Sequence, residues 1–136
     1  FVVAKTLKLM AQQGLPLTGA SINVLGITFK ENCPDIRNSQ AFPLIRELRA
    51  LGLNVVIADP RADANEVLSD EDLQLTDLSD LKRASVTLLL APHREFREKG
   101  LAWIRSITED PGVLIDVQAV FRKEAEFEKT LTYWSL

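Results

Sequence analysis

Several residue types are scarce in this sequence, and each shortage excludes a class of protein or site. The chain contains one histidine and one cysteine, which are too few to supply the usual ligand set of a zinc site. No metal site is therefore predicted. The single cysteine, Cys33, allows no internal disulfide, so a reducing, cytoplasmic location is expected.

Long hydrophobic runs and an excess of basic residues are also missing. No apolar stretch approaches the length of a membrane-spanning helix, so no membrane partner is expected. Lys and Arg total 16 against 19 Asp and Glu, a net charge of −3. The basic residues are scattered among acidic ones and form no stripe of the kind that binds nucleic acid, so no nucleic-acid partner is expected. Hydrophobic residues make up 46% of the 136 residues, enough for one domain with its own core.

Apolar runs alternate with helical patterns and turn residues along the chain. We predict strands over residues 21–28, 53–58, 86–91 and 113–117, a short edge strand over 73–76, and a final strand over 131–136. We predict helices over residues 1–13, 39–50, 63–72, 95–107 and 122–129, and a brief helix that ends at residue 84. Strands that alternate with helices indicate an α/β fold with a Rossmann-like, doubly wound parallel sheet in three layers.

The first helix has no capping residue in front of it, and the chain starts with Phe1 instead of Met. We interpret residues 1–18 as the end of a helix from a longer protein followed by a linker, and residues 19–136 as the folded domain. The apolar side chains of Val3, Leu7 and Met10 are expected to be exposed on this helix and to pair with a second copy of the chain.

The segment from Phe29 to Gln40 follows the first predicted strand directly and carries two cations, Lys30 and Arg37. Open α/β sheets bind ligands at the carboxyl ends of their strands. Lysine offers a mobile point charge and arginine a planar fork of donors. We therefore predict that both side chains project into one crevice and bind an anion. The alternative is that Arg37 orders the loop through an ion pair with Asp35 or Glu31.

The dinucleotide fingerprint G-x-G-x-x-G is absent, because the end of the first predicted strand carries one glycine, Gly26, and is followed by Phe29 and Lys30. Asp59 ends the second predicted strand, where an acid could hold a ribose hydroxyl, but it lies too far after Gly26 for that fingerprint. We interpret Asp59 as part of a turn with Pro60. The domain is thus expected not to grip a dinucleotide in the standard way.

The segments Val24–Lys30 and Asp35–Ser39 resemble the signature of the C-terminal UDP-binding domain of the UDP-glucose/GDP-mannose dehydrogenase family. The resemblance covers nearly the whole chain. The segment Lys30–Asn38 is most similar to the branch that acts on UDP-N-acetylhexosamines and makes uronic acids for surface polysaccharides.

The resemblance implies that the chain is the UDP-sugar-binding part of an NAD-dependent nucleotide-sugar 6-dehydrogenase, inactive alone, which oxidises the C6 alcohol to a carboxylate in steps that each reduce an NAD+. Phe29 and Lys30 would face the UDP-sugar substrate, and Arg37 would reach toward the NAD cofactor. NAD would be bound mainly by an absent N-terminal domain of the same polypeptide, and the central helix would form a homodimer. No catalytic residue is expected here, because the family's catalytic cysteine lies upstream; Cys33 is interpreted as a packing residue.

One departure from the family's pattern, one unassigned histidine and one rival hypothesis remain. Gln118 occupies the position at which many family members have an arginine after the last strand's Asp116, which disfavours UDP-glucose itself as substrate. His93 follows a strand and is interpreted as a structural or exposed histidine in preference to a general base. The rival hypothesis is a non-enzymatic α/β module whose Lys30/Arg37 loop docks an anionic ligand or a protein.

Overall fold

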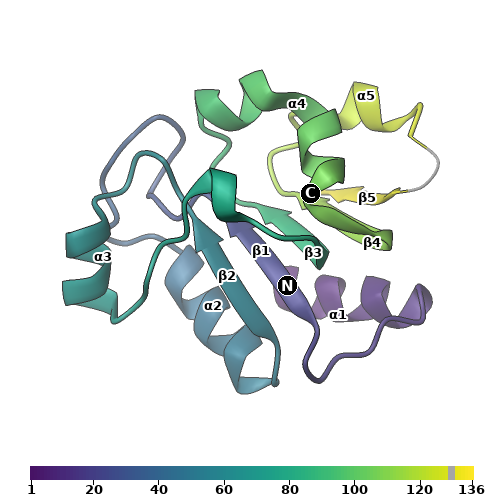
Figure 1. Ribbon diagram of the computed structural model, residues 1–136, viewed down its shortest axis with the longest axis horizontal. Helices are drawn as coiled ribbons and strands as arrows, with labels where there is room; N and C mark the ends of the chain where they lie inside the picture. Colours follow the sequence, from purple (N-terminus) through teal and green to yellow (C-terminus); the bar gives the residue numbers. More distant parts are fainter. Residues whose placement is uncertain (129–130) are drawn as a thin grey trace.

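Five parallel strands form one sheet in the computed structural model, which describes residues 1–128 and 131–136 (Figure 1). The strand order is β2-β1-β3-β4-β5. The strands are β1 (Ser21–Leu25), β2 (Asn54–Ala58), β3 (Ala84–Leu89), β4 (Thr108–Asp116) and β5 (Leu131–Ser135). The predicted doubly wound parallel sheet is confirmed.

Helices cover both faces of this sheet. They are α1 (Val2–Gln12), α2 (Ala41–Ala50), α3 (Ala64–Glu71), α4 (Arg94–Ser106) and α5 (Arg122–Ala125), with a 3-10 turn η1 (Leu78–Asp80). In Figure 1, α1 and α2 lie on one side of the sheet and α4 and α5 on the other. Side chains of β1 alternate between these layers: Ile22 and Val24 pack with the first layer, and Leu25 packs with Phe96 of α4 in the second.

Two strand boundaries differ from the sequence prediction for local reasons. β1 ends at Leu25, earlier than predicted, because Gly26 has a φ of 83° and leaves the extended conformation. β4 starts at Thr108, five residues before the strand predicted over residues 113–117, and its early part pairs with β3 through an irregularity in the register. The edge strand predicted over residues 73–76 is a single bridge between Leu75 and Ile57.

Two helices are shorter than predicted. The brief helix expected to end at residue 84 is the 3-10 turn η1, which ends at Asp80. The helix predicted over residues 122–129 is α5, which ends at Ala125; Lys129 lies outside the described residues. α4 also departs from a regular helix at Gly100, where a φ of 79° and a ψ of 177° interrupt it.

The expectation that α1 exposes its apolar side chains is wrong. Val3 and Met10 are buried, with Met10 at 0% exposure, and Leu7 packs against the same core. α1 contacts β3, β4 and α2 of its own domain. The side chains named for pairing with a second copy are therefore already covered by this chain.

The sheet order creates one topological switch point. β1 pairs with β2 on one side and with β3 on the other. The connections that follow β1 and β3 therefore run to opposite sides, which leaves a crevice at the carboxyl ends of these two strands. The Phe29–Gln40 segment begins at this crevice.

Candidate functional site

The loops that follow β1 and β3 pack against each other at the switch point. The N–H of Leu90 donates to the Leu25 carbonyl at 2.9 Å, and the N–H of Gly26 donates to the Ala58 carbonyl at 3.0 Å. A Cβ atom at Gly26 would lie 2.2 Å from the Ala91 carbonyl oxygen. Only glycine fits between these two loops, and this contact fixes where the Phe29–Gln40 segment leaves the sheet.

A cavity of about 260 Å³ opens at this point. It is lined by side chains from α1, the β1 loop, α2 and the ends of β3 and β4, including Phe29, Ser39, Leu44, Leu90 and Val117. Phe29 is 60% exposed, an unusual placement for a large apolar side chain. The cavity thus offers apolar surface with a hydroxyl beside it, a combination suited to an uncharged ring such as a base or a sugar.

Ser39 connects the cavity to the start of α2. Its hydroxyl oxygen accepts from the Ala41 N–H at 3.2 Å, which satisfies one of the free amides of the first turn. The helix predicted over residues 39–50 begins at Ala41, and its cap position falls on Gln40. Ser39 nevertheless supplies the hydroxyl that accepts from the start of the helix.

Arg37 lies in a neighbouring cavity of about 240 Å³, which shares Asn38 and Ser39 with the first. Its guanidinium donates from Nε and Nη2 to the two carboxylate oxygens of Asp35, each at 3.0 Å. These bonds lower the pKa of Asp35 and raise that of Arg37. The ion pair that the sequence left open is therefore formed, on a side chain that is 81% exposed.

Lys30 is exposed and lines neither of these two cavities. The backbone around it is well held: Thr28 Oγ1 donates to the Lys30 carbonyl at 2.9 Å, and the Phe29 N–H donates to the Asp35 carbonyl at 2.7 Å. The structure thus brings Phe29 and Arg37 to adjoining cavities. A single crevice shared by the Lys30 and Arg37 side chains stays a prediction.

His93 and Asp59 form a buried pair, and the sequence analysis did not predict that they are in contact. His93 is 0% exposed, and its Nε2 lies 3.0 Å from Asp59 Oδ2. The interpretation of His93 as a structural histidine is consistent with this burial. Asp59 Oδ1 also accepts from the N–H groups of Arg61 and Ala62, at 2.7 and 3.0 Å, which is the turn expected there.

Asp59 carries a negative charge into the interior. Burial raises the pKa of its carboxyl, but hydrogen bonds from His93 and from the backbone N–H groups of Ile27 and Arg61 outweigh burial, so the pKa is lowered. The Ile27 N–H donates to Oδ2 at 2.7 Å. Asp59 therefore ties the β1 loop to the end of β2.

The loop after β4 has its own buried anchor. Asp116 is 0% exposed and accepts from the N–H of Phe121 at 2.8 Å and from the phenol of Tyr133 at 2.6 Å. Burial and this hydrogen bond raise the pKa of Tyr133, so the phenol stays protonated. Gln118 lies on this loop and donates from Nε2 to the Leu90 carbonyl at 3.4 Å, beside the 260 Å³ cavity.

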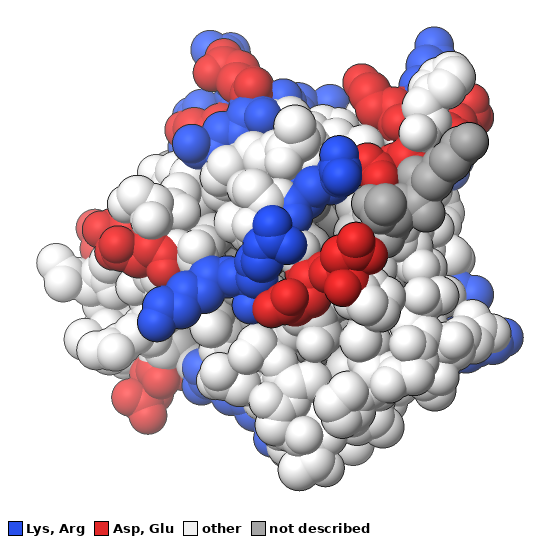
Figure 2. Space-filling model, turned by 45° about the vertical axis from the view of Figure 1, so that its right-hand side comes forward, with Lys and Arg blue, Asp and Glu red and all other residues white. Residues whose placement is uncertain are grey.

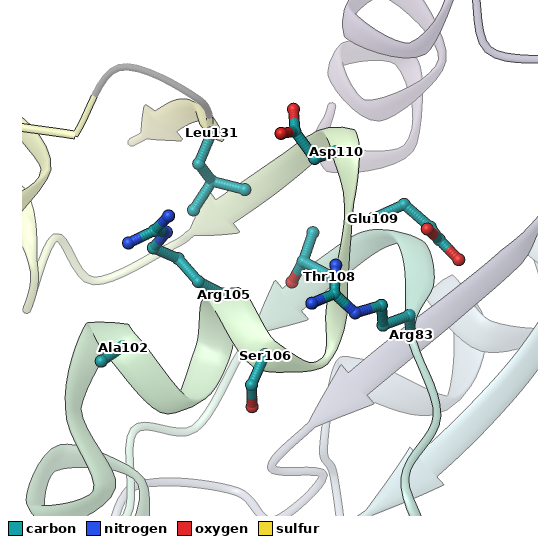
Figure 3. Close-up of a pocket in the computed structure, with 8 residues that line it drawn as sticks. All are labelled: Arg83, Ala102, Arg105, Ser106, Thr108, Glu109, Asp110 and Leu131. Atoms are coloured by element: carbon teal, nitrogen blue, oxygen red, sulfur yellow. The ribbon is translucent and has the colours of Figure 1, made fainter.

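A different cavity, of about 300 Å³, lies at the opposite edge, near the starts of β3, β4 and β5 (Figure 3). Glu109 and Asp110 contribute negative charge to its lining, and Arg105 pairs with Glu128 at 2.9 Å. The Thr108 hydroxyl donates to the Ile104 carbonyl at 2.7 Å. Because several of its polar groups already bind within the domain, this cavity is a weaker candidate than the switch-point crevice.

On the face seen in Figure 2, a row of basic side chains has acidic ones directly beside it. Among the described residues, no cluster of three or more His, Cys, Asp or Glu could hold a metal ion. In the same residues, no helix has the length and apolar composition needed to cross a bilayer. Cys33 is a free thiol at a partly exposed position of the β1 loop.

Comparison with known proteins identifies the family. The model of the UDP-glucose/GDP-mannose dehydrogenase family, UDP binding domain, matches residues 23–123. The chain belongs to this family. The resemblance that rested on the Val24–Lys30 and Asp35–Ser39 segments is therefore confirmed, and the matched range contains the Phe29–Gln40 segment and the Asp59–His93 pair.

Relatives within this family span more than the present chain. Protein CapL of Staphylococcus aureus is 36% identical over 136 residues, which is 100% of this chain and 32% of that protein. UDP-N-acetyl-D-glucosamine 6-dehydrogenase of Salmonella typhi is 33% identical over 126 residues, 91% of this chain and 29% of that protein. The chain thus corresponds to less than a third of the length of either relative.

Solved structures agree with the fold. NDP-N-acetyl-D-galactosaminuronic acid dehydrogenase from Methanosarcina mazei Go1 superposes with a TM-score of 0.82 at 20% identity, over 99% of this chain and 29% of that one. The UDP-N-acetyl-mannosamine dehydrogenase Cap5O from S. aureus gives a TM-score of 0.68 at 26% identity, over 98% of this chain and 30% of that one. Both comparisons support the Rossmann-like architecture.

Proposed function

We propose that this chain is the UDP-sugar-binding domain of an NAD-dependent nucleotide-sugar 6-dehydrogenase that acts on a UDP-N-acetylhexosamine in surface polysaccharide synthesis. The observation that carries the proposal is the position of the Phe29–Ser39 segment at the switch-point crevice of a chain that belongs to this family. Residues 1–18 would be the end of a central helix that forms a cytoplasmic homodimer. NAD would bind mainly to the part of the polypeptide that precedes this chain.

The chemistry of the segment fits such a substrate. Phe29 presents an exposed aromatic face beside the cavity, and Lys30 supplies a cation for the diphosphate of the UDP-sugar. A charge-assisted hydrogen bond is worth about 1.5–3 kcal/mol. Arg37 would reach the cofactor side by exchanging its exposed pair with Asp35 for a phosphate or carboxamide partner. These contacts position the reacting carbon, and the hydride transfer is chemistry that the nicotinamide supplies.

The direct test compares this chain with the full-length protein that carries it. The full-length protein should reduce NAD+ when UDP-N-acetylglucosamine or its mannosamine epimer is added, and this chain alone should produce no NADH. Turnover by the isolated chain would contradict the proposal. Binding of phosphate, AMP and UDP with equal affinity by the full-length protein, without turnover, would favour the non-enzymatic module instead.

Lys30→Ala in the full-length protein should lower kcat/KM for the UDP-sugar by about ten- to a hundredfold, because one charged hydrogen bond to the diphosphate is lost. The matched control is Lys82→Ala, since Lys82 is an exposed lysine next to the start of β3, at the opposite edge of the sheet. Steady-state kinetics with varied UDP-sugar measure both. Equal kinetics for the Lys30 variant and the wild type would show that Lys30 does not bind the UDP-sugar.

A further inference from the structure

We infer that His93 is a positioning residue for the substrate loop: its neutral imidazole clamps the backbone of Asn32 and thereby holds Phe29 and Lys30 at the crevice. The Asn32 N–H donates to His93 Nδ1 at 2.8 Å. Because Nδ1 accepts this bond, the ring hydrogen is on Nε2, which donates to Asp59 Oδ2 at 3.0 Å. One ring thus joins the carboxylate after β2 to the loop after β1. The relevance of the clamp to substrate binding rests on the function proposed above.

Asn32 is shaped to meet this clamp. Its φ of 61° places it in the left-handed region, which asparagine tolerates better than most residues. In this conformation its N–H points to His93, and its side-chain Oδ1 accepts from the Arg94 N–H at 2.7 Å. His93 is the cap residue of α4 and makes no side-chain cap bond itself. The Asn32 side chain therefore caps the start of α4, and His93, at the cap position of α4, accepts from the Asn32 backbone N–H.

Other contacts extend the attachment along the same loop. Arg97 Nη2, one turn along α4, pairs with Glu31 Oε2 at 2.9 Å. Thr28 Oγ1 lies 3.3 Å from His93 Nε2 and donates to the Lys30 carbonyl at 2.9 Å. Residues on both sides of Phe29 and Lys30 are thus attached to α4 or to His93, and these two residues project from the held segment with exposed side chains.

The side chains that form the clamp are more deeply buried than those of the ion pair beside it. The side chains of His93 and Asp59 are both 0% exposed, whereas those of Arg97 and Glu31 are 44% and 38% exposed. An exposed ion pair contributes little because water screens it. The acceptor nitrogen of the Asn32–His93 bond belongs to a fully buried ring, so water competes for it less than for the exposed ion pair, and this bond is expected to contribute most to the order of the loop.

Two substitutions separate the roles of the two ring nitrogens of His93. His93→Asn retains an acceptor at the position of Nδ1 and loses the donor to Asp59; His93→Gln retains a polar group at the position of Nε2 and loses the acceptor for Asn32. Amide hydrogen exchange of this chain reports on the loop directly. In His93→Gln the Asn32 amide should exchange at least about fivefold faster relative to the core strands, and in His93→Asn it should stay near the wild-type rate.

In the full-length protein, His93→Gln should raise KM for the UDP-sugar about fivefold with little change in kcat, and His93→Asn should change KM less. Equal effects of the two substitutions on Asn32 exchange would overturn the clamp. Faster Asn32 exchange in His93→Gln with an unchanged KM would overturn its role in substrate positioning. Should the full-length protein not use UDP-sugars at all, the proposed function fails, and the exchange result still decides whether the clamp exists.

One measurement needs no variant and so does not depend on either substituted chain folding. The imidazole nitrogen signals of His93 in 15N NMR of the wild-type chain should show hydrogen on Nε2 and none on Nδ1, with a coupling between Asn32 N–H and Nδ1 across the hydrogen bond. A ring that carries its hydrogen on Nδ1 would rule out the clamp, because two donors would then face each other.

Discussion

Gly26→Ala is expected to lower the free energy of unfolding by about 3–5 kcal/mol, the sum of a left-handed backbone penalty and an overpacked contact. The new Cβ would lie 2.2 Å from the Ala91 carbonyl oxygen and 2.8 Å from both the Ala91 Cβ and N atoms. Backbone atoms cannot rotate away as a side chain can, so the loops after β1 and β3 would have to separate. Urea denaturation of the isolated chain measures the change.

Gly19→Ala is the matched control for this substitution. Gly19 has a φ of 80°, close to the 83° of Gly26, but a Cβ there would meet nothing within 4 Å. The free energy of unfolding of the Gly19→Ala variant should therefore fall by about 1–2 kcal/mol, from the backbone conformation alone. If both variants lose the same amount, the close approach of the two loops is not what makes glycine necessary at residue 26.

Asp59→Ala should lower the free energy of unfolding by about 3–5 kcal/mol, because it removes a buried carboxylate that accepts hydrogen bonds from four donors. These donors are the N–H groups of Ile27, Arg61 and Ala62 and the Nε2–H of His93. The change should also loosen the β1 loop, since Ile27 lies two positions before Phe29.

The control for this substitution is Asp63→Ala. Asp63 also accepts from two backbone N–H groups, those of Asn65 and Glu66, but at an exposed helix start. Loss of an exposed cap costs about 1 kcal/mol. A loss for Asp59→Ala no larger than for Asp63→Ala would mean that burial adds nothing at residue 59.

Stability should also depend on pH through Asp59. Its pKa in the folded state is lowered from 3.8, so its contribution is fully present above that value and is lost as the pH falls through the folded-state pKa. The difference in unfolding free energy between wild type and Asp59→Asn should therefore be large at neutral pH and shrink below pH 3.8. A difference that is constant with pH would show that the carboxylate charge is not the stabilising group.

Much of the fold could be predicted because its signals are local. Largely apolar runs such as residues 86–91 predict strands that are buried on both faces, and the apolar spacing before Gly52 predicts α2. The errors were local as well. β1 was predicted too long because an apolar run continues through Ile27, and only the positive φ of Gly26 ends the strand.

The candidate site was harder to predict, because its parts are far apart in the sequence. Asp59 and His93 are separated by 34 residues, and Thr28 and His93 by 65. One signal was available: His93 and Asp59 each follow a predicted strand, and the carboxyl ends of parallel strands meet at one edge of the sheet. The same reasoning predicted a crevice shared by Lys30 and Arg37; both side chains are exposed, and Arg37 lines a cavity beside the switch point.

The amino-acid sequence was sufficient to predict the α/β class, the parallel sheet, the family and the segment that follows β1, because the apolar spacing, the turn residues and a specific local motif all lie along the chain. Tertiary structure alone decided that α1 folds back onto its own sheet and that one buried histidine joins two loops. Those outcomes depend on which side chains meet after strands β1, β2 and β3 align, and no local pattern encodes a hydrogen bond between residues that only the sheet brings together.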